Sequence, residues 1–256
     1  MRSIGAPVVS IISPKGGVGK TTVAANLAAA IAQQGRRPLL VDLDPQNATR
    51  LYHQMPLEDS RGLAVQSLLD EPWADAVYEG PYGADCLPYG TITEADRSGV
   101  EALIDDQPDW LESGLASLEL GADRVVLIDS PPGGTVYLSP ALRAADLVLF
   151  VLLPDAASFV TLPTMDRWLA EFEPSPGQPR EAYYLLNRMN NARSLCRDVH
   201  AAMKEQLGDR LCPQLVHFDS AVEEALASQQ PVTEYAPDGV AAKDFQALGA
   251  WVVEQL

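Results

Sequence analysis

The chain has 256 residues, 47% of them hydrophobic, and carries a formal net charge of −17. It is long and apolar enough for one buried core, and the absence of any run of 18 apolar residues argues against a transmembrane helix. Residues 1–7 are too short and polar for a signal peptide. The cysteines lack the spacing of a zinc site or a disulfide framework. We therefore expect a cytoplasmic protein with reduced thiols at Cys86, Cys196 and Cys212.

Apolar, strand-like runs alternate with helical stretches along the chain. An apolar run over 7–13 predicts the first strand, and apolar residues at helical spacing predict a helix over 21–35 that Gly35 ends. A Pro/Gly-rich surface turn is expected at 173–180. Further strands are expected at 38–44, 124–134, 146–154, 182–188 and 214–218. This order predicts an α/β fold with a mostly parallel, twisted sheet and helices on both faces.

Acidic residues are concentrated in one part of the chain. Residues 51–120 contain fifteen Asp or Glu and two basic residues, Arg61 and Arg97, so this segment carries −13 of the net charge. We expect it to be an elaboration on a single domain that spans 1–256. The segment is either a solvated acidic face or a surface that repels nucleic acid and anionic lipid, or that docks a basic partner.

The loop after the first strand matches a phosphate-binding P-loop with one departure. SPKGGVGKTT (13–22) fits Gly-x-x-x-x-Gly-Lys-Ser/Thr except that Pro14 stands in place of the first glycine. Glycines at 16, 17 and 19 allow backbone N–H groups to surround a phosphate, and the following helix adds its positive end. Lys20 should reach the β- and γ-phosphates, and the Thr21 hydroxyl should coordinate Mg²⁺. The alternative is a glycine turn before an ordinary helix.

Carboxylates end two of the predicted strands. Asp129 closes VVLID, the position at which a P-loop protein holds Mg²⁺ through a carboxylate. Asp42 and Asp44 close LLVDLD. An aspartate at a strand end is often a turn former, but parallel strands direct these carboxylates to the edge where the loop lies. No serine–histidine or cysteine–histidine pattern competes with this site, so the sequence predicts a P-loop NTPase.

Three motifs together resemble the ParA/MinD group of ATPases: KGGVGKTT (15–22), VDLDPQNAT (41–49) and VLIDSPPG (126–133). The resemblance implies ATP and Mg²⁺ as cofactors. It also implies that a lysine matching Lys15 crosses to the partner subunit and contacts the phosphates bound there, so that a homodimer encloses two ATPs. Gly16 and Gly17 would leave room for this approach, which explains why the first glycine is dispensable.

The same resemblance assigns roles to further residues. It implies that Asp44 orients the attacking water, that Asp42 supports the magnesium shell, and that Asn187 hydrogen-bonds adenine. The expected catalytic residues are Lys15, Lys20 and Asp44, and the expected metal-binding residues are Thr21, Asp42 and Asp129. The expected nucleotide-binding residues are Lys15, Gly16, Gly17, Val18, Gly19, Lys20, Thr21, Thr22 and Asn187.

Two other stretches point to one branch of this group. PYGTITEADR (88–97) and residues 141–169 resemble the BcsQ family, whose genes accompany bacterial cellulose synthase. This resemblance implies a slow, partner-regulated ATPase that switches by dimerising and that assembles, localises or regulates the cellulose synthesis and secretion complex. It also implies a small companion subunit at the cytosolic side of that complex. The protein would then reach the inner face of the membrane through partners, without inserting directly.

Two alternatives remain open at the level of sequence. A DNA-segregation ATPase would need basic clusters, whereas the chain has 18 basic residues against 35 acidic ones and no basic stripe, so nucleic acid is not an expected partner. VHFDSAVEEA (216–225) also lacks the arginine that DNA-partitioning members often carry. A nucleotide-binding scaffold with little turnover is the second alternative. We expect the C-terminal apolar stripe to pack in the core; it consists of Phe245, Leu248, Trp251, Val252 and Leu256.

Overall fold

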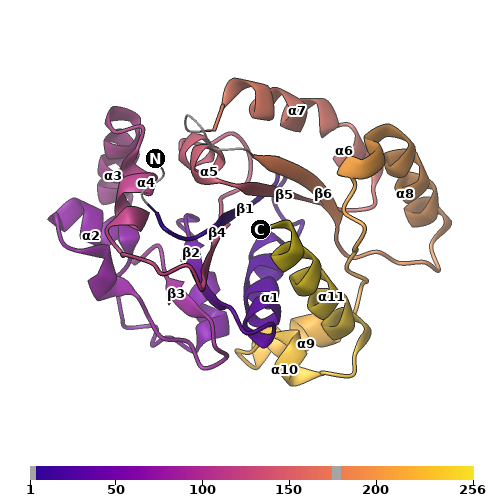
Figure 1. The fold of residues 1–256 in the computed structure, drawn as a ribbon, viewed down its shortest axis with the longest axis horizontal. Helices are drawn as coiled ribbons and strands as arrows, with labels where there is room; N and C mark the ends of the chain where they lie inside the picture. Colours follow the sequence, from indigo (N-terminus) through magenta and orange to yellow (C-terminus); the bar gives the residue numbers. More distant parts are fainter. Residues whose placement is uncertain (1–3, 175–179) are drawn as a thin grey trace.

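The protein forms one six-stranded parallel sheet with the strand order β3-β2-β4-β1-β5-β6 (Figure 1). The structure, a computed structural model, describes residues 4–174 and 180–256. Most of the predicted turn at 173–180 and the first three residues thus lie outside the described residues. The strands are β1 (Val8–Ile12), β2 (Arg37–Asp42), β3 (Asp85–Leu87), β4 (Arg124–Asp129), β5 (Leu147–Leu152) and β6 (Glu181–Leu186).

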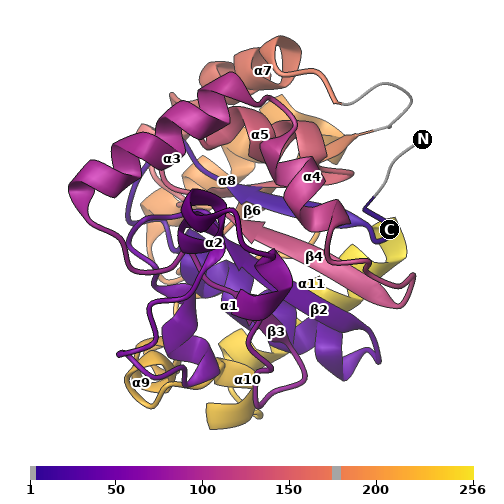
Figure 2. The same ribbon diagram turned by 90° about the vertical axis from the view of Figure 1, so that its left-hand side faces the viewer.

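Helices cover both faces of this sheet. Figures 1 and 2 show α1 and α11 on one face, and α3, α4, α5 and α7 on the other. Short helical turns occupy 49–53, 73–76 and 208–210. The helices are α1 (Lys20–Gln33), α2 (Leu63–Leu69), α3 (Glu94–Asp106), α4 (Trp110–Ala116), α5 (Leu138–Ala144), α6 (Ala156–Phe159), α7 (Leu162–Glu171), α8 (Ser194–Leu207), α9 (Ala221–Ala227), α10 (Val232–Tyr235) and α11 (Val240–Gln255).

The strands are apolar throughout because successive side chains enter two different cores. In β1, Val8 and Ile12 pack with residues of α3, α4, α5 and α7, whereas Val9 and Ile11 pack with residues of α1 and α11. Side chains alternate between the faces of a strand, so a strand covered on both sides has no polar face. The predicted α/β fold, with a parallel sheet and helices on both faces, is confirmed.

One predicted strand is wrong and one strand was missed. Residues 214–218 form no strand; Val216 N donates to Leu186 O of β6 at 2.9 Å, and His217 forms an isolated bridge with Met189, which lies just beyond β6. Pro213, which has no backbone N–H, adjoins this stretch and interrupts a regular ladder. The sixth strand is instead β3, which lies inside the acidic segment and pairs with β2. Its three residues are too few to show a period of two.

The sheet register brings the predicted carboxylates together. β2 and β4 pair so that Asp42 lies directly opposite Asp129, and Ile11 near the end of β1 also pairs with Asp129. β2 ends at Asp42, so Asp44 belongs to the following loop rather than to the strand. The carboxyl edge of the sheet thus carries two buried carboxylates beside the loop between β1 and α1.

The C-terminal helix lies in the core, as the sequence predicts. Phe245, Leu248 and Val252 of α11 are fully buried against α1, Trp251 is half-buried, and the terminal Leu256 is exposed. Among the described residues, none of the helices combines the length and the hydropathy required to cross a membrane.

Candidate functional site

The glycine loop between β1 and α1 adopts a conformation that its sequence makes possible. Gly17 and Gly19 have φ angles of 75° and 90°, in the left-handed region that most residues avoid. Gly19 caps the start of α1, and a Cβ atom at this position would lie 2.5 Å from Asn187 Nδ2. Glycine is therefore required at 19 both by the backbone angle and by the close approach of Asn187.

Lys20 is the buried cation of the site. Its side chain begins α1 and is 7% exposed. Burial lowers the pKa of Lys20, while the nearby carboxylates of Asp129 and Asp44 act in the opposite direction. Because burial disfavours the charged lysine, an anion bound beside it would stabilise the ammonium and be held by it in turn.

Thr21 and Asp129 form a direct pair at the base of the loop. The Thr21 hydroxyl donates to Asp129 Oδ2 at 2.6 Å. The other carboxylate oxygen, Oδ1, is buried without a hydrogen-bond partner among the described residues. Burial and the neighbouring Asp42 raise the pKa of Asp129. A buried oxygen without a partner is unfavourable unless a ligand satisfies it, so this atom marks a position for a cation or a donor.

Asp42 holds the loop that follows β2. It accepts hydrogen bonds from Thr49 N at 3.1 Å, from the Thr49 hydroxyl at 2.7 Å and from Asp44 N at 2.9 Å. Burial raises the pKa of Asp42 to about 6. Asp44 itself is half-buried and accepts from Gln46 N at 2.9 Å through one oxygen. Asp42 thus orders residues 44–49. The second oxygen of Asp44 accepts no hydrogen bond from the described residues.

Lys15 forms an ion pair within its own chain. Its Nζ lies 3.5 Å from Asp155 Oδ2, in the loop that follows β5, and the two side chains are 30% and 38% exposed. Gly16 and Gly17 beside it are exposed, and a Cβ atom on Gly17 would meet nothing within 4 Å. The surface beside Lys15 is thus open at these two glycines in the single chain.

Asn187 braces the glycine loop from the neighbouring side. Its Nδ2 donates to Val18 O at 2.8 Å, its Oδ1 accepts from Arg188 N at 2.9 Å, and it is 4% exposed. A narrow pocket opens next to it, also lined by Thr22, His217 and Phe218. Phe218 is 55% exposed, so an aromatic face is available at the mouth of this pocket. The position predicted to meet adenine therefore adjoins a hollow with an aromatic wall.

The donor set fits magnesium only in combination with phosphate. Within the described ranges, no group of three or more His, Cys, Asp or Glu side chains is arranged to hold a metal ion without help. Mg²⁺ is usually bound by one or two carboxylates together with water and substrate phosphates. Thr21, Asp42 and Asp129 offer a hydroxyl and two carboxylates, which suits that mode.

Comparison with known proteins shows the family to which the chain belongs. The family model for the cellulose biosynthesis protein BcsQ matches residues 7–253. The chain belongs to the BcsQ family. BcsQ of Escherichia coli (strain K12) is 29% identical over 245 residues, which cover 95% of this chain and 93% of that protein. The chromosome partitioning protein ParA of Caulobacter vibrioides is 31% identical over 238 residues, which cover 89% and 86%.

Solved structures show the same fold as this BcsQ-family chain. The septum site-determining protein MinD from Pyrococcus horikoshii, complexed with Mg-ADP, superposes with a TM-score of 0.77 at 23% identity, covering 96% of each chain. The predicted P-loop NTPase fold and the predicted ParA/MinD and BcsQ resemblance are confirmed.

Two residues that contact the predicted site residues of this BcsQ-family chain, Asp155 and Thr49, were not predicted from the sequence. Asp155 was not singled out, although it follows the predicted strand over 146–154 and the rule that parallel strands converge at their carboxyl ends applies to it as well. Thr49 lies within the motif at 41–49, but its two bonds to Asp42 depend on the fold of the loop. No sequence pattern around Thr49 predicts its contact with Asp42.

Proposed function

We propose that this chain is an ATPase that dimerises on binding ATP and that acts in bacterial cellulose biosynthesis. The observation that carries the proposal is the convergence of Lys20, Thr21, Asp42 and Asp129 on one glycine loop at the carboxyl edge of the sheet. ATP and Mg²⁺ are the proposed ligands. Lys20 and the amides of 16–22 bind the phosphates, since a cation and oriented N–H groups match their charge.

Each carboxylate has a separate proposed role. Thr21, Asp42 and Asp129 would hold the magnesium shell, and Mg²⁺ when bound would neutralise phosphate charge. Asp44 would orient the attacking water through its second oxygen, because the first accepts from Gln46 N. Asn187 holds Val18 in place and would meet the adenine in the adjoining pocket.

Lys15 is the residue through which ATP binding would be coupled to dimerisation. In the isolated chain Lys15 rests on Asp155, at a surface that the exposed Gly16 and Gly17 keep open. On ATP binding, Lys15 would leave Asp155 and contact the phosphates bound by the partner subunit. Two such contacts, related by symmetry, would join the homodimer. Slow turnover under the control of partners would then set the lifetime of the dimer.

The family defines the proposed setting. A BcsQ-family ATPase would assemble, localise or regulate the cellulose synthesis and secretion complex from its cytosolic side, together with a small companion subunit. We propose a cytoplasmic protein that partners recruit to the inner face of the membrane. Nucleic acid is not a proposed partner because the net charge of −17 opposes phosphate-backbone binding. Retention on DNA at low salt would favour the segregation alternative instead.

Substitution of Lys20 tests the core of this proposal. Lys20→Ala should abolish ATP binding by calorimetry and phosphate release by a turnover assay, because the phosphates lose the buried cation inside the loop. Lys204→Ala, which removes an exposed lysine of α8, is the matched control and should leave both unchanged. Equal ATP affinity in the two variants would show that the site has been misread. ATP binding without measurable turnover in the wild type would favour the scaffold alternative.

A further inference from the structure

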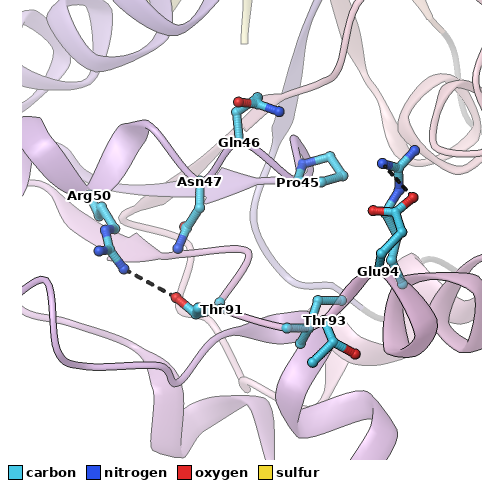
Figure 3. Close-up of a pocket in the computed structure, with 10 residues that line it drawn as sticks. Pro45, Gln46, Asn47, Arg50, Thr91, Thr93 and Glu94 are labelled. Atoms are coloured by element: carbon cyan, nitrogen blue, oxygen red, sulfur yellow. Dashed lines mark hydrogen bonds and ion pairs between the residues drawn. The ribbon is translucent and has the colours of Figure 1, made fainter.

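A second cavity lies between the loop that follows Asp44 and the segment before α3. It has a volume of about 300 Å³ and is lined on one side by residues 45–50 and on the other by residues 90–97 (Figure 3). The second segment belongs to the stretch at 88–97 whose sequence resembles BcsQ proteins, yet the proposed ATPase chemistry gives it no role.

The walls of this cavity are fixed by contacts between the two segments. Asn47 Oδ1 accepts from Tyr89 N at 3.1 Å, which ties the loop to the chain just before Gly90. Gly90 has a φ angle of 96°, and a Cβ atom there would lie 2.9 Å from Val65 Cγ2 and 3.1 Å from Ser60 O. A side chain at 90 would strain the turn, so the shape of the cavity depends on this glycine.

One amide group at this cavity has an unused hydrogen-bond donor. Asn47 is 8% exposed, and its Oδ1 is engaged by Tyr89, but its Nδ2 makes no hydrogen bond within the described part of the chain. Figure 3 shows the Asn47 amide and the Arg50 guanidinium both extending toward Thr91. The Nδ2 atom itself is open to the cavity rather than buried, so an acceptor on a ligand can reach this unused donor.

Arg50 supplies a positive charge at the same place. Its guanidinium contacts the carbonyls of Leu57 at 3.0 Å and Asp59 at 3.4 Å and the Thr91 hydroxyl at 3.5 Å. Among the described residues, no carboxylate lies within ion-pair distance of Arg50. The carbonyls orient the guanidinium, and its charge also acts on the Asp59 carboxylate from beyond ion-pair distance. An oriented arginine without a direct ion pair is able to bind an oxyanion.

The other arginine of the lining is already neutralised. Arg97 is paired with Glu94 at 3.5 Å and with Glu101 at 2.9 Å, and Glu94 is the one carboxylate among the lining residues. Arg50 is therefore the lining cation that has no ion pair among the described residues. One guanidinium in a cavity of this size suits a small anion.

We propose that this cavity binds a phosphate group through Arg50, Asn47 Nδ2 and the Thr91 hydroxyl, with Arg97 at its far wall. The phosphate is either inorganic phosphate or the phosphate of a small monoester, since the volume lies at the lower end of small-molecule sites. Binding requires neither Lys20 nor the glycine loop, so the inference does not rest on the proposed ATPase.

An occupant would act on the loop that carries the predicted catalytic carboxylate. Asn47 lies in the same loop as Asp44, Arg50 lies in the helical turn that follows this loop, and Thr49 between them donates to Asp42. A ligand bonded to Asn47 and Arg50 restrains residues 44–50, which sets the position of Asp44. Phosphate binding in this cavity would therefore modulate hydrolysis at the neighbouring site.

The test uses inorganic phosphate and ribose 5-phosphate as probes on the Lys20→Ala protein, in which the glycine loop lacks its cation. Calorimetry should show saturable binding of at least one probe. Adding Arg50→Gln should weaken it tenfold or more, whereas adding Arg197→Gln should not. Arg197 is the matched control because it is an exposed arginine of α8 whose guanidinium also contacts a carbonyl, that of Asn191.

A second variant separates binding from folding. Asn47→Asp keeps the acceptor for Tyr89 N but replaces the free amide donor by a negative charge, so it should abolish probe binding with the fold intact by thermal unfolding. Tighter binding of ribose 5-phosphate identifies a monoester as the ligand, and tighter binding of inorganic phosphate identifies free phosphate. The proposal is overturned if neither probe binds saturably, or if binding survives both Arg50→Gln and Asn47→Asp.

Discussion

Lys15 Nζ lies 3.5 Å from Asp155 Oδ2, and this contact joins the loops that follow two neighbouring strands, β1 and β5. Asp155 also caps α6 by accepting from Ser158 N through its other oxygen at 2.6 Å. The lysine predicted to act on a second subunit is therefore held by its own chain. Dimerisation through Lys15 has to break this pair, so the pair opposes dimerisation.

Asp155→Asn should strengthen ATP-dependent dimerisation. Asparagine can still cap α6, but it removes the charge that holds Lys15. An exposed ion pair contributes about 0.2–1 kcal/mol, so the two pairs released per dimer amount to roughly a two- to thirtyfold tighter dimer. Sedimentation with a slowly hydrolysed ATP analogue measures this. A dimer weakened by Asp155→Asn would mean that Asp155 supports the dimer contact.

Lys15→Ala should leave nucleotide binding by the monomer intact and weaken only the ATP-bound dimer. Lys20 and the loop amides remain, whereas two symmetry-related contacts to phosphate are lost. At roughly 1.5–3 kcal/mol for each contact, dimerisation should weaken by about two to four decades. Calorimetry on the monomer and sedimentation with the analogue separate the two effects. Equal dimer fractions at micromolar protein would make Lys15 an ordinary surface residue.

Asp44→Ala should preserve ATP binding and slow hydrolysis by roughly 10²-fold or more, because the phosphate cradle is untouched but the water loses its orienting carboxylate. The slowed protein should accumulate as the dimer. Asp44→Asn is the matched control for structure, since its side-chain oxygen can still accept from Gln46 N. Both variants should be slow. Full turnover in Asp44→Asn would show that the charge of Asp44 has no part in the reaction.

Asn187→Ala should lower nucleotide affinity in a way that reveals what the side chain contacts. The substitution removes the bond to Val18 O and leaves Arg188 N without its acceptor, which should lower the free energy of unfolding by about 1–3 kcal/mol. If Asn187 also meets adenine, affinity for ATP should fall more than affinity for GTP. Equal losses for the two nucleotides would assign Asn187 to loop support alone.

His53 should make the folding stability fall as the solution becomes acidic. Burial lowers the pKa of His53 below its ordinary 6.5 in the folded state, so the unfolded chain binds more protons between the two pKa values. The contribution is complete above 6.5 and is lost as the pH falls through the folded pKa, with a slope of at most about 1.4 kcal/mol per pH unit.

His53→Asn isolates this contribution of His53. An asparagine amide can still donate to Thr49 O, as His53 Nδ1 does at 3.2 Å, but it does not titrate. The free energy of unfolding of wild type minus that of the variant should decrease from pH 7.5 to pH 5. Other groups, such as Asp42, affect both proteins and cancel in this difference. A flat difference over that range would contradict the assignment.

The sequence alone was sufficient for the parts of the site that lie close together along the chain. Gly16, Gly17 and Gly19, followed by Lys20 and Thr21, form a contiguous motif whose conformation depends on local backbone freedom and on the start of one helix. Five strands were predicted because a strand covered on both faces is apolar along its whole length. Asp129 followed from the rule that parallel strands converge at their carboxyl ends.

The tertiary structure decided which distant groups meet. β3 is a strand because β2 offers it an open edge, although three residues carry no periodic pattern. Residues 214–218 are apolar enough for a strand, but their bridge within the described residues is the isolated one between His217 and Met189, just beyond β6. Asp155 beside Lys15, and Asn47 with Arg50 beside Thr91, join segments between 41 and 140 residues apart. The propensity of a segment to form a helix or strand depends on residues that are neighbours in the chain. These contacts depend instead on how the sheet and its loops pack in three dimensions. No pattern along the sequence therefore predicts them.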